Sequence, residues 1–158
     1  MVIRFTVRSI LGICFMASSI AFPAGVRAET KPLLEPPPDY KASPAFRAIL
    51  KAKPGSEIFE IRKIEYLLER LRRSKCLFIR NREEHKGEMA VLHMQWKYAR
   101  YKDEIKTAED FARKIADGSR KTREDYHIKR ADGRIYSSTE ILLNELAELD
   151  EALGKEIS

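Results

Sequence analysis

Two histidines and their basic neighbours are the side chains best suited to chemistry in this sequence. His85 and His93 can each act as an acid, a base or a metal ligand near neutral pH. Their separation of eight residues matches no zinc-binding spacing, so we predict no metal and no cofactor. In a helix that begins near Glu88, His93 and Lys97 share a face, with Arg80 at the mouth of an anion-binding groove. We therefore predict one polar ligand-binding site, made of Arg80, Asn81, His85, His93 and Lys97.

A purely structural role for these residues is the alternative interpretation. His93 then hydrogen-bonds a backbone group where a helix meets a strand, and Lys97 is solvated. Asn81 in that case caps or turns a loop, as asparagine commonly does. The two interpretations differ in whether a ligand is bound at all.

An enzyme of the hydrolase class is a further alternative. His85 or His93 would serve as the base, and the nucleophile would be Cys76, Ser74 or Ser119. The chain has no glycine-flanked serine elbow and no glycine-rich phosphate loop. Cys76 precedes three apolar residues, which favours a buried and inert thiol. We therefore predict no catalytic residue and a function without enzymatic activity.

Apolar residues at helical spacing predict the elements that hold the site. The stripe of the first helix runs from Ile58 to Leu71, with Lys63 and Arg70 on its outer, charged side. A second helix is marked by Met89, Leu92, Trp96 and Ala99, and a neighbouring apolar stripe indicates that it is covered on more than one side. Two further helices begin at capping residues, one at Thr107 and one at Ser137, and the latter carries Glu140, Glu145 and Glu148 on its exposed side.

Two short segments predict a sheet. Cys76 to Ile79 is a compact apolar run that suits a buried strand. Residues 126–136 alternate in character around Asp132-Gly133, a pair that supplies the backbone angles of a tight hairpin turn. Pairing of the strand with this hairpin gives an α+β domain of three to four helices packed on a small antiparallel sheet.

The first 28 residues have the parts of an export signal. Arg4 and Arg8 give a positive start, residues 10–22 form an apolar run too short to span a bilayer, and Val26-Arg27-Ala28 suits cleavage. We predict a signal peptide over 1–28, a periplasmic or secreted location, and no transmembrane segment in the mature chain. Proline fixes its own backbone, and the prolines of the mature chain all lie within 29–56.

Differences in composition along the chain predict three parts: the signal peptide over 1–28, a tether and a folded domain. Residues 29–56 read as a Pro-rich tether, in which 42–53 can form a short helix that docks through Phe46, Ile49 and Leu50. Residues 57–158 contain no proline and form a single domain. Cys76 is the only cysteine after residue 28, so packing rather than disulfides must hold this domain together.

Charge argues against nucleic acid as a partner. Removal of residues 1–28 takes away three arginines and lowers the net charge from +6 to +3, an excess that neutralises few phosphates. Contact with anionic envelope polymers or lipid head groups stays open, because basic residues gather in one stretch. Interspersed acidic residues favour a mixed, solvated surface there instead. The basic residues are Arg113, Lys114, Arg120, Lys121, Arg123, Lys129, Arg130 and Arg134.

A pattern of residues runs from Phe78 to Ala116 in a distinctive order and spacing. It comprises Phe78-Ile79-Arg80-Asn81, His85, Ala90-Val91, His93, Lys97, Ile105, Thr107-Ala108-Glu109, Phe111 and Ile115-Ala116. This pattern resembles a family of small exported bacterial proteins catalogued as a domain of unknown function, and the resemblance implies no activity.

The sequence departs from that family at two glycines. The family carries glycine after its Arg-Asn pair, where this chain has Arg82, and a Thr-Gly-x-Pro-Tyr segment, where this chain has Thr122-Arg123-Glu124-Asp125-Tyr126. Glycine permits sharp turns and close approach of a ligand to the backbone. Either these loops fold differently here or they do not form the ligand site.

The function that fits these observations is a non-enzymatic module of the bacterial envelope. We expect it to bind an envelope protein or a small envelope component through a helix–strand edge, because an unpaired strand offers free backbone groups to a partner.

Overall fold

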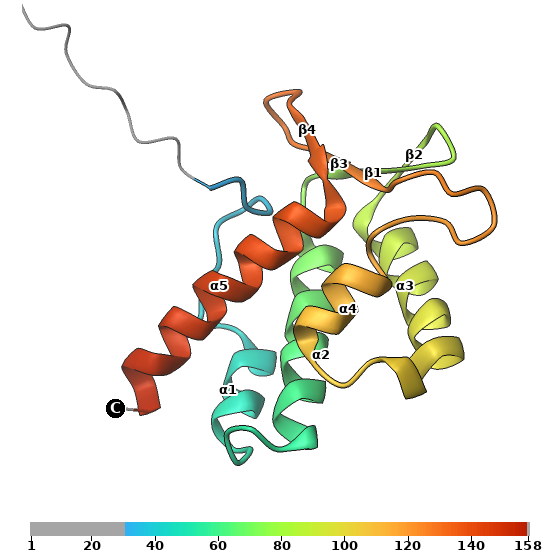
Figure 1. The fold of residues 1–158 in the computed structure, drawn as a ribbon. Coiled ribbons are helices and arrows are strands. Elements are labelled where there is room, and N and C mark those ends of the chain that lie inside the picture. Colours follow the sequence, from blue (N-terminus) through green and yellow to red (C-terminus); the bar gives the residue numbers. More distant parts are fainter. Residues whose placement is uncertain (1–30, 158) are drawn as a thin grey trace, which may run out of the picture.

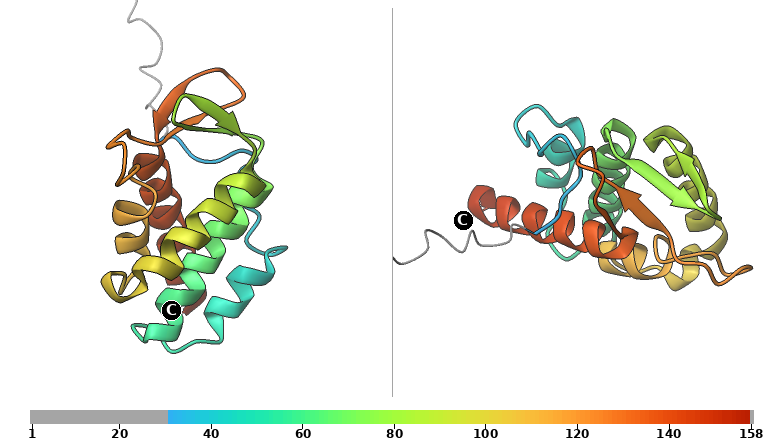
Figure 2. Two further views of the ribbon diagram at one scale, coloured as in Figure 1. Left: turned by 90° about the vertical axis from the view of Figure 1, so that its right-hand side faces the viewer. Right: turned by 90° about the horizontal axis from the view of Figure 1, so that it is seen from above.

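The computed structural model describes residues 31–157, so the predicted signal peptide over 1–28 lies outside the described residues. Within this range the chain forms five α-helices, a 3₁₀ helix and a four-stranded antiparallel sheet, which confirms the predicted α+β class with slightly more helices than expected. Figure 1 shows the sheet at one end of the helices, and the view from above in Figure 2 shows the strands lying over the helix ends. The elements are α1 (Pro44–Leu50), α2 (Glu57–Arg73), β1 (Leu77–Arg80), β2 (Glu83–His85), α3 (Gly87–Tyr101), η1 (Lys102–Glu104), α4 (Ala108–Lys114), β3 (His127–Lys129), β4 (Ile135–Ser137) and α5 (Ser138–Ile157).

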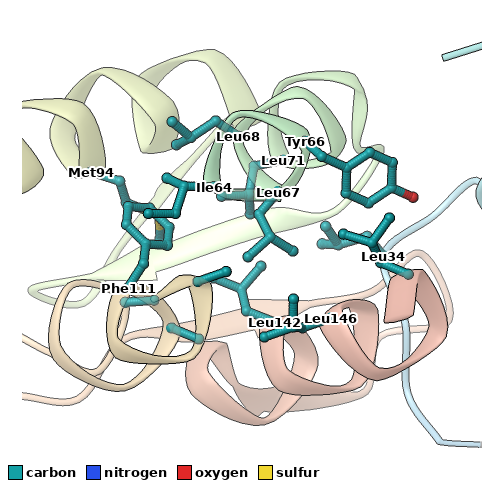
Figure 3. Packing of buried hydrophobic residues seen from close by; sticks show 14 of the residues in the cluster. Leu34, Ile64, Tyr66, Leu67, Leu68, Leu71, Met94, Phe111, Leu142 and Leu146 are labelled. Atoms are coloured by element: carbon teal, nitrogen blue, oxygen red, sulfur yellow. The ribbon is translucent and has the colours of Figure 1, made fainter. Parts of the chain in front are cut away.

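Helix α2 is the central helix of the fold and packs against α1, α3, α4 and α5. Its apolar side chains meet those of the surrounding helices in one core cluster, shown in Figure 3. Lys63, Tyr66 and Arg70 are buried as well, so the predicted charged outer side of this helix is wrong for Lys63 and Arg70. The reason is that α5 covers that side and supplies carboxylates to both cations, whereas Ile58 on the predicted buried stripe is exposed.

The proline-rich segment packs on the body of the protein over its described part, residues 31–56. Leu34, Phe46 and Ile49 belong to the core cluster. The expected helix within 42–53 is present as α1, which begins where the Ser43 hydroxyl accepts a hydrogen bond from the Phe46 N–H. This stretch is therefore part of the folded body rather than a free spacer.

A buried ion pair ties this segment to two helices. Arg70 of α2 donates from Nε and Nη2 to the two carboxylate oxygens of Glu145 in α5, at 2.8 and 3.0 Å. The Leu34 N–H donates to the same carboxylate at 2.7 Å, and the Leu34 carbonyl accepts from Arg70 at 3.0 Å. The prediction that Glu145 is exposed is wrong, since Glu145 is 1% exposed. Each charge is thus paired, as a buried charge must be.

The sheet has the strand order β2-β1-β3-β4. The predicted strand pairs with the predicted hairpin, with Phe78 opposite Ile128 and Ile128 opposite Tyr136. Strand β2 was not predicted, because Glu83, Glu84 and His85 carry none of the β-branched or apolar character that marks a strand. It forms because the turn before it folds the chain back along β1.

The two positions where the resembled family carries glycine keep a glycine-like backbone here. Asn81 and Arg82 form the two-residue loop between β1 and β2, with φ of 50° and 66°, the sign that a type I′ hairpin turn requires at both residues. Arg123 has φ of 57°. Both loops therefore keep a conformation suited to glycine, and the arginines bear its steric cost.

Among the described residues no helix is both long and apolar enough to cross a membrane. The longest, α5, spans 20 residues but carries charged side chains along its length.

Replacing Glu145 by glutamine should strongly destabilise the protein. Arg70 would keep its burial but lose its counter-charge, and breaking a buried pair in this way costs about 3–5 kcal/mol. Urea denaturation would measure the loss. Glu151→Gln is the matched control, because it removes an exposed i,i+4 pair with Lys155 on the same helix and should leave the stability nearly unchanged. Equal losses in the two variants would contradict a central role for the buried pair.

Replacing Arg82 by glycine should stabilise the protein by about 0.5–1 kcal/mol, because glycine adopts the left-handed backbone without the Cβ clash. The ion pair with Glu124 that this removes is 3.8 Å long and exposed, and contributes little. Arg72→Gly, at an exposed position in the last turn of α2, should instead lower the stability by up to about 1 kcal/mol. Thermal unfolding of both variants checks the opposite signs, and a lower melting temperature for Arg82→Gly would exclude the turn assignment.

Candidate functional site

Helix α3 presents an apolar stripe to solvent. Met89, Leu92 and Trp96, which mark the predicted second helix, are 56%, 60% and 59% exposed. The buried face of α3 is formed instead by Ala90, Val91, Met94 and Lys97. Both stripes of this helix consist largely of apolar residues. Among the described residues, other parts of the chain bury the stripe of Ala90, Val91 and Met94 and leave the stripe of Met89, Leu92 and Trp96 exposed.

A pocket of about 230 Å³ opens between α3 and the sheet. Phe78, Ala90 and Met94 form its apolar inner wall, and Met89 and Leu92 form its rim. The register of the sheet brings the polar residues together, because Arg80 and Phe78 lie on one face of β1 and Phe78 stands opposite His85 on β2.

Three of the five predicted site residues line this pocket, namely Arg80, His85 and His93. Asn81 lies in the adjacent turn and is exposed. Lys97 is 3% exposed and does not line the pocket, so the alternative in which it is solvated is wrong. Its Nζ donates to the carbonyls of Ile115 and Gly118 at 2.5 and 2.7 Å, which anchors the chain that follows α4.

Tyr126 separates Lys97 from the pocket. His93 Nε2 lies 2.9 Å from the Tyr126 hydroxyl, while Lys97 Nζ lies 5.0 Å from the centre of the same ring. His93 and Lys97, which share a face of α3, thus contact different parts of the Tyr126 side chain, namely its hydroxyl and its ring. Tyr126 matches the tyrosine of the resembled family's Thr-Gly-x-Pro-Tyr segment, which was the available sequence signal for its role.

The protonation of His93 follows from its partners. Arg80 Nη1 donates to His93 Nδ1 at 2.7 Å, and because a guanidinium has no acceptor, neutral His93 carries its proton on Nε2 and donates to Tyr126. Burial, together with the charges of Arg80 and Lys97, lowers the pKa of His93 to about 4. His93 is therefore neutral at pH 7 and orients the Arg80 guanidinium.

Lys97 keeps its charge near neutral pH although burial lowers its pKa to about 8, with a smaller contribution from Arg120. Its ammonium group is satisfied by backbone carbonyls and by the Tyr126 ring. The role of Lys97 in this structure is to fix the position of Tyr126 and of the loop after α4.

Two buried polar atoms at the pocket have no hydrogen-bond partner among the described residues. They are the Oγ atom of Ser138, which is 1% exposed, and the Nε2 atom of His85. Ser138 is the first residue of α5 and was not predicted as a site residue, because serine at a helix start ordinarily signals a cap. Only the tertiary structure shows that Ser138 is buried.

None of the nucleophiles considered for a hydrolase lines this pocket, although Ser119 interacts with the side chain of Tyr126. Cys76 is buried, and the Ser74 hydroxyl accepts a hydrogen bond from the Cys76 N–H. Ser119 lines a separate polar hollow between α4 and residues 117–125. Both nitrogens of His93 are also engaged, by Arg80 and Tyr126, so His93 is not free to act as a base toward a predicted nucleophile.

The basic stretch from 113 to 134 is a mixed surface. Six of its eight cations form ion pairs with carboxylates, at Glu109, Asp110, Glu104, Glu84, Glu35 and Asp132. Most of their positive charge is therefore balanced by carboxylates of the protein itself, which weakens the case for an anionic polymer as ligand. No group of three or more histidine, cysteine or acidic side chains within residues 31–157 is placed to hold a metal ion.

His93 should make the stability of the protein depend on pH. Between pH 6.5 and about 4 the unfolded chain binds a proton at His93 that the folded chain does not, so the free energy of unfolding falls as the pH falls through this window. A His93→Gln variant can accept from Arg80 and donate to Tyr126 without titrating. Its stability should fall by about 2 kcal/mol less than that of the wild type between pH 7 and pH 4.

Urea denaturation at the two pH values measures this difference. All other residues are identical in the two proteins, so comparing the two isolates His93. Parallel losses in both proteins would show that His93 is not held neutral in the folded state.

Comparison with protein-family models matches residues 60–150 to a model described as "Family of unknown function (DUF5329)". This range runs from α2 into α5 and includes every residue that lines the pocket. No curated protein and no solved structure matches the chain. The match covers more than half of the 158 residues and confirms the predicted resemblance to a family of unknown function. The chain therefore belongs to the DUF5329 family.

Proposed function

We propose that this protein is a non-enzymatic binding module whose site is the pocket between α3 and the sheet. The observation that carries the proposal is a largely apolar pocket that contains an arginine without a carboxylate partner among the described residues. Arginine in such surroundings is an anchor for an acceptor or an anion, and the apolar wall supplies hydrophobic contact.

The size of the pocket sets the size of what it holds. A cavity of about 150 Å³ accepts benzene, and sites for drug-sized ligands begin at about 300 Å³. The pocket of about 230 Å³ lies between these values. It therefore suits a small ligand or one apolar end of a larger molecule.

The polar wall of the pocket is preorganised. Arg80 is held by His93, His93 by Tyr126, and Tyr126 by contact with buried Lys97. Side chains that are already oriented lose little freedom when a ligand arrives, which favours affinity. This chain of contacts also explains why the site needs residues that do not touch the ligand.

The proposed location is outside the cytoplasm. The support is the charge and hydropathy pattern of residues 1–28, which is typical of a cleaved export signal. A small apolar or amphipathic component of the bacterial envelope is then the proposed class of ligand. The described residues of the pocket all lie downstream of that leader.

A dye-binding experiment tests the pocket. The dye anilinonaphthalene sulfonate (ANS) combines aromatic rings with one negative charge, and its fluorescence rises in an apolar site. We expect saturable binding of one dye per chain, which an Ala90→Leu variant should weaken at least tenfold, because the added side chain fills the pocket.

Ala147→Leu is the matched control, since it makes the same change at an exposed helical position in α5 and should leave binding unchanged. Circular dichroism verifies that both variants fold. Failure of the folded wild type to bind the dye, or equal binding by Ala90→Leu, would overturn the proposed function.

A further inference from the structure

The pocket has an unusual distribution of polarity. Its rim is apolar, because Met89 and Leu92 are more than half exposed there. Its other lining residues include Arg80, together with Ser138 and His85, whose Oγ and Nε2 atoms are buried and have no partner among the described residues. A hollow that only held bulk water would favour the reverse arrangement, with polar groups at the opening.

The polar atoms inside the pocket are suited to one kind of group. Arg80 donates N–H groups, the Ser138 hydroxyl can donate, and His85 Nε2 donates in one of its tautomers. Three donors on residues that line one pocket fit an acceptor with several lone pairs, and a carboxylate offers about four.

The charge of the pocket favours a single negative charge. Neutral His93 contributes no positive charge and no free N–H donor, because one nitrogen accepts from Arg80 and the other donates to Tyr126. Lys97 is committed to the carbonyls of Ile115 and Gly118. Among the residues that line the pocket, Arg80 is then the permanent cation, so a monoanion is matched better than a phosphate dianion.

One acidic side chain lies near and does not block this site. Glu83 Oε2 is 3.9 Å from His85 Nε2, too far for a hydrogen bond, and the Glu83 side chain is 77% exposed. Glu84 is paired with Lys129 at 2.9 Å. Neither carboxylate lines the pocket.

The apolar rim continues along α3 away from the pocket. Trp96 follows Leu92 by one helical turn, and its ring lies 6.0 Å from the ring of His93. The backbone of α3 is hydrogen-bonded within the helix, so this surface offers contact to apolar groups and no backbone donors to a peptide. A hydrocarbon chain has no polar groups to leave unpaired here, whereas a polypeptide has two in every residue.

We propose that the ligand is a straight-chain alkyl carboxylate, bound with its carboxylate inside the pocket at Arg80, Ser138 and His85 and its chain leaving over Met89 and Leu92 toward Trp96. This inference rests on the proposed function and specifies the ligand class and orientation. The head group explains the unpartnered polar atoms, and the chain explains the exposed apolar stripe.

Displacement of bound dye tests the class of ligand. Decanoate, decanol and decyltrimethylammonium share one chain and differ in head group, and each is used below the concentration at which it forms micelles. Decanoate should displace ANS at a concentration at least tenfold lower than the other two, the gain expected from hydrogen bonds to a charged group. The single tryptophan, Trp96, gives an independent signal when the chain covers it.

Variants test the orientation. Arg80→Gln should abolish the preference for decanoate over decanol, whereas Arg113→Gln, which alters an exposed arginine on α4, should preserve it. Ser138→Ala should weaken decanoate severalfold without loss of stability, because it removes a hydroxyl that has no partner among the described residues. From hexanoate to decanoate the affinity should rise about threefold to fourfold per methylene, and Leu92→Gln should flatten this rise.

The outcomes separate the two proposals. If ANS binds in the pocket but decanoate and decanol displace it equally, the carboxylate inference is overturned and the binding module stands. If a short peptide with a free carboxylate displaces the dye and decanoate does not, the ligand is a peptide end and the alkyl chain is excluded. Absence of dye binding by the folded protein overturns both proposals.

Discussion

The fold depends on one buried ion pair. Arg70 of α2 and Glu145 of α5 neutralise each other inside the protein, and both also hydrogen-bond to the backbone of Leu34. Three parts of the chain that are distant in sequence are thereby held at fixed positions. Ser138, at the start of the same helix, lies seven residues from Glu145, or roughly 10 Å along the helix axis. The position of the pocket interior is therefore set by a contact that lies outside it.

The direct junction of β4 and α5 transmits this constraint to the sheet. Ser137 ends β4 and Ser138 begins α5, so the helix and the last strand cannot move independently. The Ser138 N–H also donates to the Tyr126 carbonyl at 2.9 Å, which links the start of α5 to the segment before β3. The hydroxyl of the same Tyr126 meets His93. A sequence of short-range contacts thus connects the core to the polar wall of the pocket.

The sequence predicted which elements form better than which of their faces are buried. Apolar spacing located α2, α3 and α5, and the Asp132-Gly133 pair located the hairpin, because these signals are local. Arg70 and Glu145 were placed on solvated faces, since a charge that will be paired in the core looks the same in sequence as one in water. Helix α3 has two apolar faces, and only the packing of α2 against one of them decides which is exposed.

The residues of the candidate site also divide into those that the sequence predicts and those that only the tertiary structure reveals. Arg80, His85 and His93 gather because strand register and a helix bring them to one space, and their residue types had singled them out. Tyr126 and Ser138 come from distant segments, and only the tertiary fold adds them. Ser138 Oγ and His85 Nε2 lack partners among the described residues, at a cost to stability that an apolar side chain would avoid. Because both atoms belong to residues that line the pocket together with Arg80, their lack of partners supports the proposal that a polar group from outside the chain binds there.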